Sequence, residues 1–237
     1  MLGFHYSRWE HITASEMIKR NQEFTLNKFP VDVFWLDIEH TPQKQYFEWN
    51  RTTFPQELVE VMSHQIRAES RRLVVITDPH IRADPGYRAY LHGLEPNMTA
   101  PFFVRDCTNQ TFVGESWPGK STWIDFFNEP AREFWGSLYR SFEQTPADLY
   151  SFWIDMNEPA VFNSVEQQTF PLTCLHRVQG SQDVLHRDVH NAYGLFMQKA
   201  SFSAIQKLSA RRAFLLTRSY FISSQQFGAF WTGDNFS

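Results

Sequence analysis

WIDMNEP, residues 153–159, is the stretch that decides the fold of this chain. It overlaps the β-rich run Tyr150–Met156, in which aromatic and β-branched side chains favour a strand. The following Asn-Glu-Pro predicts that the strand stops in a turn. Asp155 therefore stands near the end of a predicted strand, on backbone that the strand fixes in place.

Two other β-rich runs also end in an acid, and a fourth acid follows a further run. Asp37 closes FWLD, Asp78 closes VVITD and Asp234 closes FWTGD. Some of these runs are apolar on consecutive residues, which is typical of buried parallel strands. The predicted strands are Leu2–His5, Asp32–Ile38, Arg72–Asp78, Tyr150–Met156, Ala213–Arg218 and Ala229–Thr232.

Helical patterns lie between these strands. Thr13-x-x-Glu16 is a capping box that opens the first helix. Pro55 suits the first turn of a second helix, Asn128 caps a third, and a fourth spans about 190–209. Strands that alternate with helices pair in parallel through right-handed crossovers.

Two insertions, 79–127 and 158–189, interrupt this alternation, and both follow strand ends. In a β/α barrel, the loops that follow the strands build the active-site face. We therefore expect the function of the chain at that face.

The composition excludes some classes of function. Lys and Arg number 22 and Asp and Glu 26, so the formal charge of 22 − 26 = −4 argues against nucleic-acid binding by bulk charge. No apolar run approaches the roughly 20 residues that span a bilayer. Aromatic residues form 16% of the chain, and they fill cores or line pockets for sugars. Cys107 and Cys174 are too few for a disulfide framework, and one bridge or two thiols are both open.

Acids gathered at one rim permit two-carboxylate chemistry, in which one group attacks and the other gives and takes a proton. The alternative is that each acid caps a helix or turns the chain. The tryptophans beside the acids either stack on the C–H face of a sugar or belong to the core. Arg218 ends a predicted strand, where it either pairs with a carboxylate and keeps it ionised or forms a surface salt bridge.

Other chemistries have weaker support. His186 and His190 stand four residues apart in HRDVH, a spacing that places two imidazoles on one helix face as zinc ligands. HExxH, clustered cysteines and the HxH pair of a metal-dependent barrel hydrolase are absent from the sequence. The serine-hydrolase, dinucleotide and P-loop motifs do not occur either.

With WIDMNEP, the chain resembles the catalytic barrel of glycoside hydrolase family 31, the retaining α-glucosidases. WxDMNEP followed by WTGD is highly specific, and FWLDIEHT with DPHI is most similar to the branch of glucosidase II and neutral α-glucosidase C. The resemblance implies an α/β fold, a (β/α)8 TIM barrel of which residues 1–237 hold about six of eight βα units in one partial domain. Further matching segments, in the family's order, are GFHYSRW, VVITDPHI, FFVRD, ESWPG, HRDVHNAYG, LLTRSYF and FWTGDN.

The resemblance also implies roles for single residues. Asp155 corresponds to the nucleophile, and Asp234 corresponds to the acid/base, which carries a proton in the first step. Retention predicts catalytic carboxyl groups about 5–5.5 Å apart, an α-glucose product and no metal or organic cofactor. Positions that bind the glucose in subsite −1 match Asp37, Asp78 and Arg218, and its walls match Trp9, Trp117, Trp153, Met156 and Trp231, with Ile76 beside them.

Family members continue through two more strands and C-terminal β domains, so we expect this chain to be a fragment, an isoform or a partial gene model. Its open barrel would expose edge strands and a large apolar face. The alternative to an active hydrolase is a truncated chain that keeps a sugar-binding pocket without turnover. The resemblance adds a glucosylated N-glycan as substrate and a noncatalytic β subunit as partner. Sequons at Asn50, Asn97, Asn109 and Asn235 favour the lumen of the endoplasmic reticulum over the cytoplasm.

Overall fold

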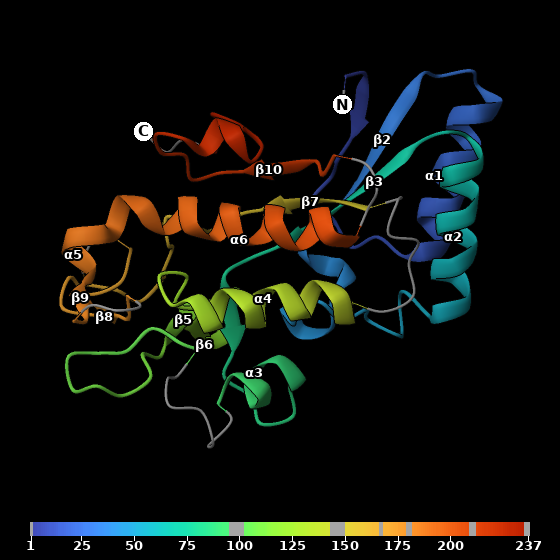
Figure 1. The fold of residues 1–237 in the computed structure, drawn as a ribbon. Helices are drawn as coiled ribbons and strands as arrows, with labels where there is room; N and C mark the ends of the chain where they lie inside the picture. The colour runs from blue at the N-terminus through green and yellow to red at the C-terminus, as the bar shows by residue number, and fades with distance from the viewer. Residues whose placement is uncertain are drawn as a thin grey trace.

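A computed structural model describes residues 2–94, 102–142, 150–165, 168–178, 182–208 and 212–234. Its main sheet has six parallel strands in the order β1-β2-β3-β7-β10-β11, curled into an open part of a barrel (Figure 1). The predicted incomplete TIM barrel is thereby confirmed. The strands are β1 (Phe4–Tyr6), β2 (Val31–Leu36), β3 (Arg72–Thr77), β7 (Tyr150–Ile154), β10 (Leu215–Thr217) and β11 (Ala229–Phe230).

The central strand β3 is buried on both faces. Leu73, Val74 and Val75 have no exposed surface, because β2 and β7 flank the strand and helices cover the outside of the sheet. Val75 pairs in register with Phe152 of β7. This burial explains why the sequence of β3 is a continuous apolar run rather than an alternating one.

The predicted helices are present, with shifted ends. Glu16 N–H donates to Thr13 Oγ1 at 3.2 Å and Thr13 N–H donates to Glu16 Oε2 at 2.8 Å, which confirms the capping box. Pro55 is the N-cap residue of the second helix, one position before its first turn. Asn128 is the N-cap residue of the third, but its side chain makes no capping hydrogen bond to the helix. The helices are α1 (Ala14–Leu26), α2 (Gln56–Ala68), α4 (Glu129–Ser141) and α6 (Tyr193–Leu208).

The fourth helix begins later than predicted. Residues before Tyr193 form the short helix α5 (His186–Val189) and the 3-10 turn η3 (His190–Ala192). In Figure 1, α4 and α6 lie side by side against one part of the sheet, and α1 and α2 pack together beside β2 and β3.

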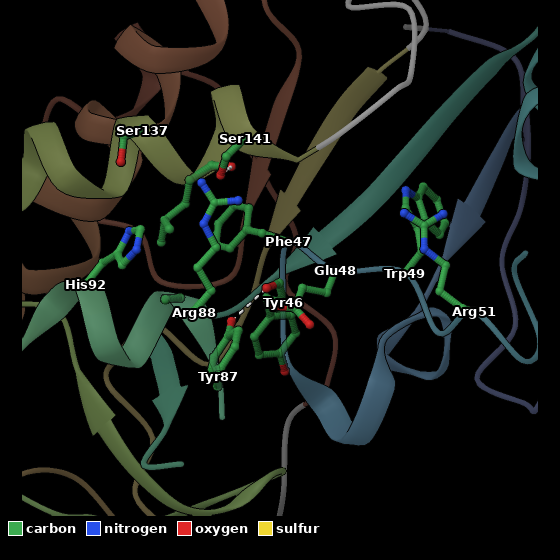
Figure 2. A pocket seen from close by; sticks show the side chains of 12 residues that line it. Tyr46, Phe47, Glu48, Trp49, Arg51, Tyr87, Arg88, His92, Ser137 and Ser141 are labelled. Carbon is green, nitrogen blue, oxygen red and sulfur yellow. Dashed lines mark hydrogen bonds between the residues drawn. The ribbon is translucent and has the colours of Figure 1, made fainter. Parts of the chain in front are cut away.

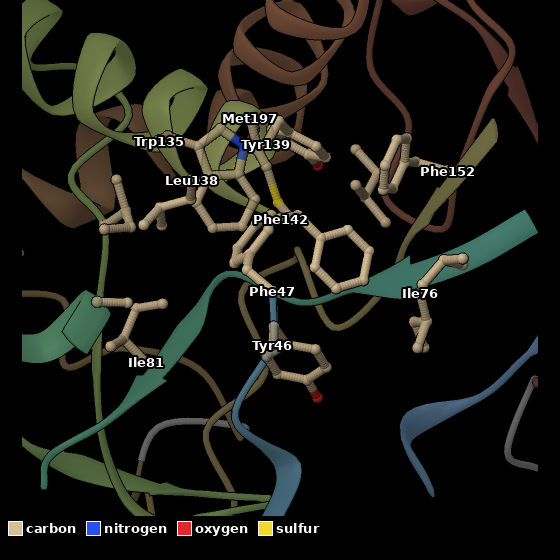
Figure 3. Packing of buried hydrophobic residues seen from close by; sticks show 14 of the residues in the cluster. Tyr46, Phe47, Ile76, Ile81, Trp135, Leu138, Tyr139, Phe142, Phe152 and Met197 are labelled. Carbon is tan, nitrogen blue, oxygen red and sulfur yellow. The ribbon is translucent and has the colours of Figure 1, made fainter. Parts of the chain in front are cut away.

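Aromatic rings fill the space between the helices and the sheet (Figure 3). Phe47 meets the rings of Trp135 and Tyr139 edge-on, with centroids 5.1 and 5.0 Å apart. Trp135 Nε1–H donates to Ser201 Oγ at 2.9 Å, so its polar atom is satisfied inside the core. Such edge contacts add to the free energy gained by burying the rings.

Both insertions contain small elements that no periodic pattern predicts. The first holds β4 (His80–Arg82), α3 (Arg88–Gly93), β5 (Gly114–Ser116) and β6 (Gly119–Trp123), with the three strands in one antiparallel sheet. The second holds the hairpin of β8 (Leu175–His176) and β9 (Val184–Leu185). Three further 3-10 turns are η1 (Ile38–His40), η2 (Pro42–Lys44) and η4 (Ser224–Gln226).

The structure also bears on the predictions about membrane spans, the two cysteines and the glycosylation sequons. Among the described helices, none has the length and apolar character needed to cross a membrane. Cys107 is exposed and Cys174 is buried, and no disulfide joins them. The sequons at Asn97 and Asn235 begin outside the described residues.

Candidate active site

The predicted site residues stand at the carboxyl ends of the parallel strands. Asp37, Asp78, Asp155 and Arg218 are each the first residue after β2, β3, β7 and β10. Asp234 follows the end of β11 by four residues. The common strand direction brings these groups to one edge of the sheet, where barrel enzymes build their active sites.

Three of the charged groups at this edge form what we call the ion-pair chain, Asp155–Arg218–Glu158. Arg218 Nη1 lies 3.0 Å from Asp155 Oδ1. On its other side, Arg218 Nε–H and Nη2–H donate to the two carboxylate oxygens of Glu158 at 2.8 and 2.9 Å. One guanidinium therefore holds two carboxylates, with the bidentate contact on Glu158.

Burial dominates the ionisation of Asp155. It raises the pKa of this carboxyl to about 6, although the Arg218 charge and the Met156 N–H pull it down. The expectation that Arg218 would keep Asp155 ionised has the correct direction for that one contact. It left out desolvation, which is the larger effect because the residue is only 7% exposed.

The same contacts distinguish the two oxygens of Asp155. Arg218 Nη1 and Met156 N–H, the latter at 2.8 Å, both approach Oδ1. None of the described residues donates a hydrogen bond to Oδ2. The Oδ2 atom is thus the oxygen left to react.

Asn157 holds the end of β10 in place. Its amide donates to Thr217 Oγ1 at 2.9 Å, and its Oδ1 accepts from Ser219 N–H at 3.0 Å. These two bonds lie on either side of Arg218. Met156, before Asn157, has a φ of 56°, a left-handed conformation that non-glycine residues seldom adopt outside turns and functional sites.

Asp78 has no exposed surface and depends on a network of neutral groups. The Tyr46 hydroxyl donates to Asp78 Oδ2, and His80 Nε2 lies 3.2 Å from the same hydroxyl and 3.6 Å from that oxygen. Ser116 Oγ in turn lies 3.1 Å from His80 Nδ1. Burial and the Asp155 charge raise the pKa of Asp78 well above its usual value.

The second oxygen of Asp78 is available to a ligand. Oδ1 is buried and has no hydrogen-bond partner among the described residues. A buried acceptor without a partner is costly unless something else supplies the bond. The sequence singled out Asp78, and considered His80 only as a possible metal ligand. It did not identify Tyr46, which is 32 residues away and meets Asp78 only in the fold.

Asp37 and Asp234 complete the set of acids. Burial raises the pKa of Asp37 to about 6, although its carboxylate caps η1 by accepting from Ile38 N–H at 2.8 Å. Asp234 is exposed, and its negative charge contributes to raising the pKa of both Asp37 and Asp155. The charge of Asp234 therefore acts on both acids.

Tryptophans form two groups near these acids. Trp153 makes edge contacts with Trp35 and Trp231, with ring centroids 5.9 Å apart in each case. Trp9 and Trp117 form the second pair, 5.7 Å apart and 66% and 39% exposed. Both groups keep ring surface available for a ligand, whereas Ile76 and Met156, at 2% and 5% exposed, belong mostly to the interior.

A separate hollow of about 370 Å³ lies between the loop 46–51, α3 and α4 (Figure 2). None of the predicted site residues lines it. Figure 2 shows Tyr46 and Phe47 pointing in opposite directions, and Tyr87 donating its hydroxyl to the Tyr46 carbonyl at 2.7 Å. The Tyr46 hydroxyl is bonded to Asp78. Because no predicted site residue lines the hollow, it is not the candidate active site.

His186 and His190 do not have the geometry of a zinc site. Their rings are hydrogen-bonded to each other, with His186 Nε2 and His190 Nδ1 2.8 Å apart. Ligands of one metal direct their lone pairs at a common point, whereas these two atoms face each other. Within the described residues, no group of three or more His, Cys, Asp or Glu side chains is arranged to hold a metal ion.

Comparison with known proteins gives consistent results. The family model described as "Glycosyl hydrolases family 31 TIM-barrel domain" matches residues 1–237. Human "Neutral alpha-glucosidase C" is 39% identical over 99% of this chain and 25% of its own length. "Probable glucan 1,3-alpha-glucosidase" of Arabidopsis thaliana is 38% identical over 98% of the chain and 24% of its own length.

A solved structure agrees with the sequence comparisons. The crystal structure of the ER glucosidase II heterodimeric complex, of catalytic subunit and the binding domain of regulatory subunit, superposes with a TM-score of 0.87 at 38% identity. It covers 99% of this chain and 25% of that chain. The present chain thus spans about a quarter of the length of these relatives.

Proposed function

The chain belongs to glycoside hydrolase family 31, and from this premise we propose that it is a retaining α-glucosidase that releases terminal α-linked glucose. The observation that carries the proposal is the ion-pair chain at the end of β7. It presents a buried carboxylate, Asp155, with Oδ1 held by a cation and Oδ2 open. A nucleophile needs this combination of a fixed orientation and a free lone pair.

The proposed reaction has two steps. Asp155 Oδ2 attacks the anomeric carbon while Asp234 protonates the leaving oxygen, and a glucosyl–Asp155 ester forms. Water then attacks the same carbon, Asp234 takes its proton, and the Asp155 carboxylate leaves. Each step inverts the anomeric centre, so the glucose released keeps the α configuration.

The other residues hold the sugar. Asp78 Oδ1, buried without a partner, suits a sugar hydroxyl as its hydrogen-bond donor. Asp37 offers a second acceptor, and Trp153 and Trp231 offer ring faces to the C–H side of the sugar. In this proposal, Tyr46 and His80 are positioning residues that fix Asp78 Oδ2 and leave Oδ1 to the ligand.

The test is the stereochemistry of the first product. Proton NMR follows a 4-nitrophenyl α-glucoside as the purified chain hydrolyses it, and we expect the α anomer to appear before mutarotation. First formation of the β anomer would rule out double displacement. Asp155→Asn should abolish release, while Glu57→Gln, which changes an exposed acid on α2 away from the proposed site, should leave it unchanged.

Substrate and compartment are a finer part of the proposal. The names of the relatives include a glucan 1,3-alpha-glucosidase and an ER glucosidase II with a regulatory subunit. We infer that the substrate is an α-1,3-linked glucose on an N-glycan, that the compartment is the lumen of the endoplasmic reticulum, and that a noncatalytic subunit binds the full protein. A panel of α-1,3-, α-1,4- and α-1,6-linked glucose disaccharides tests the linkage.

An inactive chain that keeps a sugar pocket is the second candidate, because the chain spans only a quarter of the relatives' length. Isothermal titration with glucose and with an iminosugar analogue separates the two. Binding without turnover supports the second candidate, whereas turnover that Asp155→Asn abolishes supports the first.

A further inference from the structure

A buried row of hydrogen-bonded rings, which we call the histidine chain, runs from Asp125 through His176 and His186 to His190. Asp125 Oδ1 lies 2.9 Å from His176 Nδ1, and His176 Nε2 lies 2.9 Å from His186 Nδ1. The last link, His186 Nε2 to His190 Nδ1, is 2.8 Å. Asp125, His176 and His186 have at most 1% exposed surface.

The bonds of Asp125 fix the direction of every proton in this chain. Asp125 accepts from the backbone N–H of Phe127 and of Arg177, at 3.2 and 2.7 Å, so both oxygens act as acceptors. His176 Nδ1 must then carry the proton and donate, which leaves His176 Nε2 as an acceptor. The same reasoning applies to the next two links: His186 Nδ1–H donates to His176 Nε2, and His190 Nδ1–H donates to His186 Nε2.

The outer end of the chain is consequently a single basic nitrogen. His190 Nδ1–H donates to His186, and His190 Nε2 is the one ring nitrogen of the chain with no partner in it. His190 is half-buried and lines a hollow of about 780 Å³ together with Arg187, Asp188 and Phe221. A proton can thus reach Nε2 from solvent while the three links stay intact.

The outer end lies beside the ion-pair chain. Gly194, on the first turn of α6, has no room for a side chain, because an added Cβ would lie 2.5 Å from Ser219 Oγ and 2.8 Å from the Asn157 carbonyl. The start of α6 is therefore packed directly on the two segments that carry Glu158 and Arg218. The charge of Glu158, in the loop after β7, acts on His190. The other charged groups around it are Arg187 and Asp188 of α5, which line the same hollow, and His186 of α5 lies against its Nδ1.

We propose that His190 is a positioning residue for the ion-pair chain, and that the histidine chain fixes its tautomer so that it gains and loses a proton beside Glu158. The proposal rests on the proposed function, since it assigns a role around the same Asp155. A proton on Nε2 makes an imidazolium that offsets the Glu158 charge. That charge raises the pKa of Asp155, so the imidazolium favours ionised Asp155.

The ionisation of the two histidines fits this arrangement. Burial and the neighbouring rings lower the pKa of His186 to about 3, so this ring stays a neutral link. Burial also lowers the pKa of His190, while the Glu158 charge raises it. Burial therefore moves the protonation of His190 to lower pH, and the Glu158 charge opposes this shift.

Nitrogen-15 NMR of the histidine-labelled chain tests the tautomers. We expect His176, His186 and His190 all to carry the proton on Nδ1, with ring protons that exchange slowly with water. An Nε2–H tautomer at any of the three at pH 7.5 would overturn the proposal. The measurement uses no substrate, so a failure to hydrolyse glucosides counts only against the proposed function.

Carbon-13 titration of the Asp155 carboxyl tests the coupling. In His190→Gln, which keeps a hydrogen bond to His186 but carries no charge, the Asp155 midpoint should rise by a few tenths of a pH unit. His64→Gln, at an exposed position on α2, should leave it unchanged. Should His190→Gln fail to fold, Glu158→Gln gives the reciprocal measurement: the His190 midpoint should fall. An unmoved midpoint in either experiment rejects the positioning role.

Discussion

Replacing Arg218 with Gln isolates the effect of the cation on the proposed nucleophile. At the observed 3.0 Å separation, an effective dielectric constant of about 20 gives an attraction of about 5 kcal/mol. This value is an upper bound because the new amide and water replace part of the contact. An arginine usually lowers the pKa of a neighbouring carboxyl by about 1 to 3, and we expect the pKa of Asp155 to rise by this amount when Arg218 is replaced.

The rate at neutral pH follows from that range. The pKa of Asp155 should rise from about 6 to about 7–9. At pH 7 the ionised fraction would fall from about 0.9 to between about 0.5 and 0.01, so kcat/KM should fall about 2-fold to 100-fold from ionisation alone.

The assay is the pH profile of kcat/KM on a 4-nitrophenyl α-glucoside between pH 4 and pH 10. The acid limb should move to higher pH, and Arg218→Gln should recover part of its rate as the pH rises. Arg20→Gln, which removes a surface ion pair on α1, is the matched control and should not shift the profile. A uniformly reduced rate with an unshifted acid limb would refute the electrostatic role of Arg218.

Three further substitutions test the acids and their supports. Asp37→Asn should raise the free energy of unfolding at pH 7.5 by up to about 3 kcal/mol. The pKa of Asp37 is raised to about 6, so the folded protein loses stability as the pH rises through that value, and the neutral Asn avoids this loss. In thermal melts the gain should vanish near pH 4. Tyr46→Phe removes the hydroxyl that bonds Asp78, so titration with an iminosugar should show weaker binding, and chemical denaturation a loss of about 1–3 kcal/mol. Glu158→Gln removes a charge that raises the pKa of Asp155, so the acid limb of the pH profile should move to lower pH.

Each of these substitutions has a control or a contrary result. Tyr193→Phe also deletes a buried hydroxyl, bonded to the Ile124 carbonyl at 2.8 Å, so it should lower stability without weakening sugar binding. Asp32→Asn, at an exposed position of β2, should not reproduce the stabilisation expected of Asp37→Asn. An acid limb that moves to higher pH in Glu158→Gln would contradict the assigned sign.

The sequence was sufficient to predict which residues gather at the edge of the sheet. Asp37, Asp78 and Asp155 each follow an apolar run, and parallel strands place their carboxyl ends together. This inference needs only the order of the strands and their direction. It does not depend on how any side chain is rotated, and the six-stranded order bears it out.

Contacts between loops that are distant in the chain could not be predicted from the sequence. Tyr46 reaches Asp78 from a loop in which Gln43, Lys44 and Phe47 have positive φ values, a path that no periodic pattern encodes. The spacing of His186 and His190 correctly predicted two neighbouring rings. Spacing does not say whether lone pairs converge on a metal or face each other, and here they face each other.

Arg218 is shared between two acids, and this explains how Asp155, the proposed nucleophile, can be buried and still reactive. Burial alone would lower the pKa of Arg218, and its bonds with Glu158 and Asp155 reverse this effect and hold it protonated. Because Glu158 takes two of its donors, Asp155 receives only one, at Oδ1. A bidentate contact on Asp155 would lower its pKa further but would also occupy the lone pairs of Oδ2. The structure gives Asp155 a single contact from Arg218. Burial then leaves the Asp155 pKa at about 6, and Oδ2 stays free for the proposed attack.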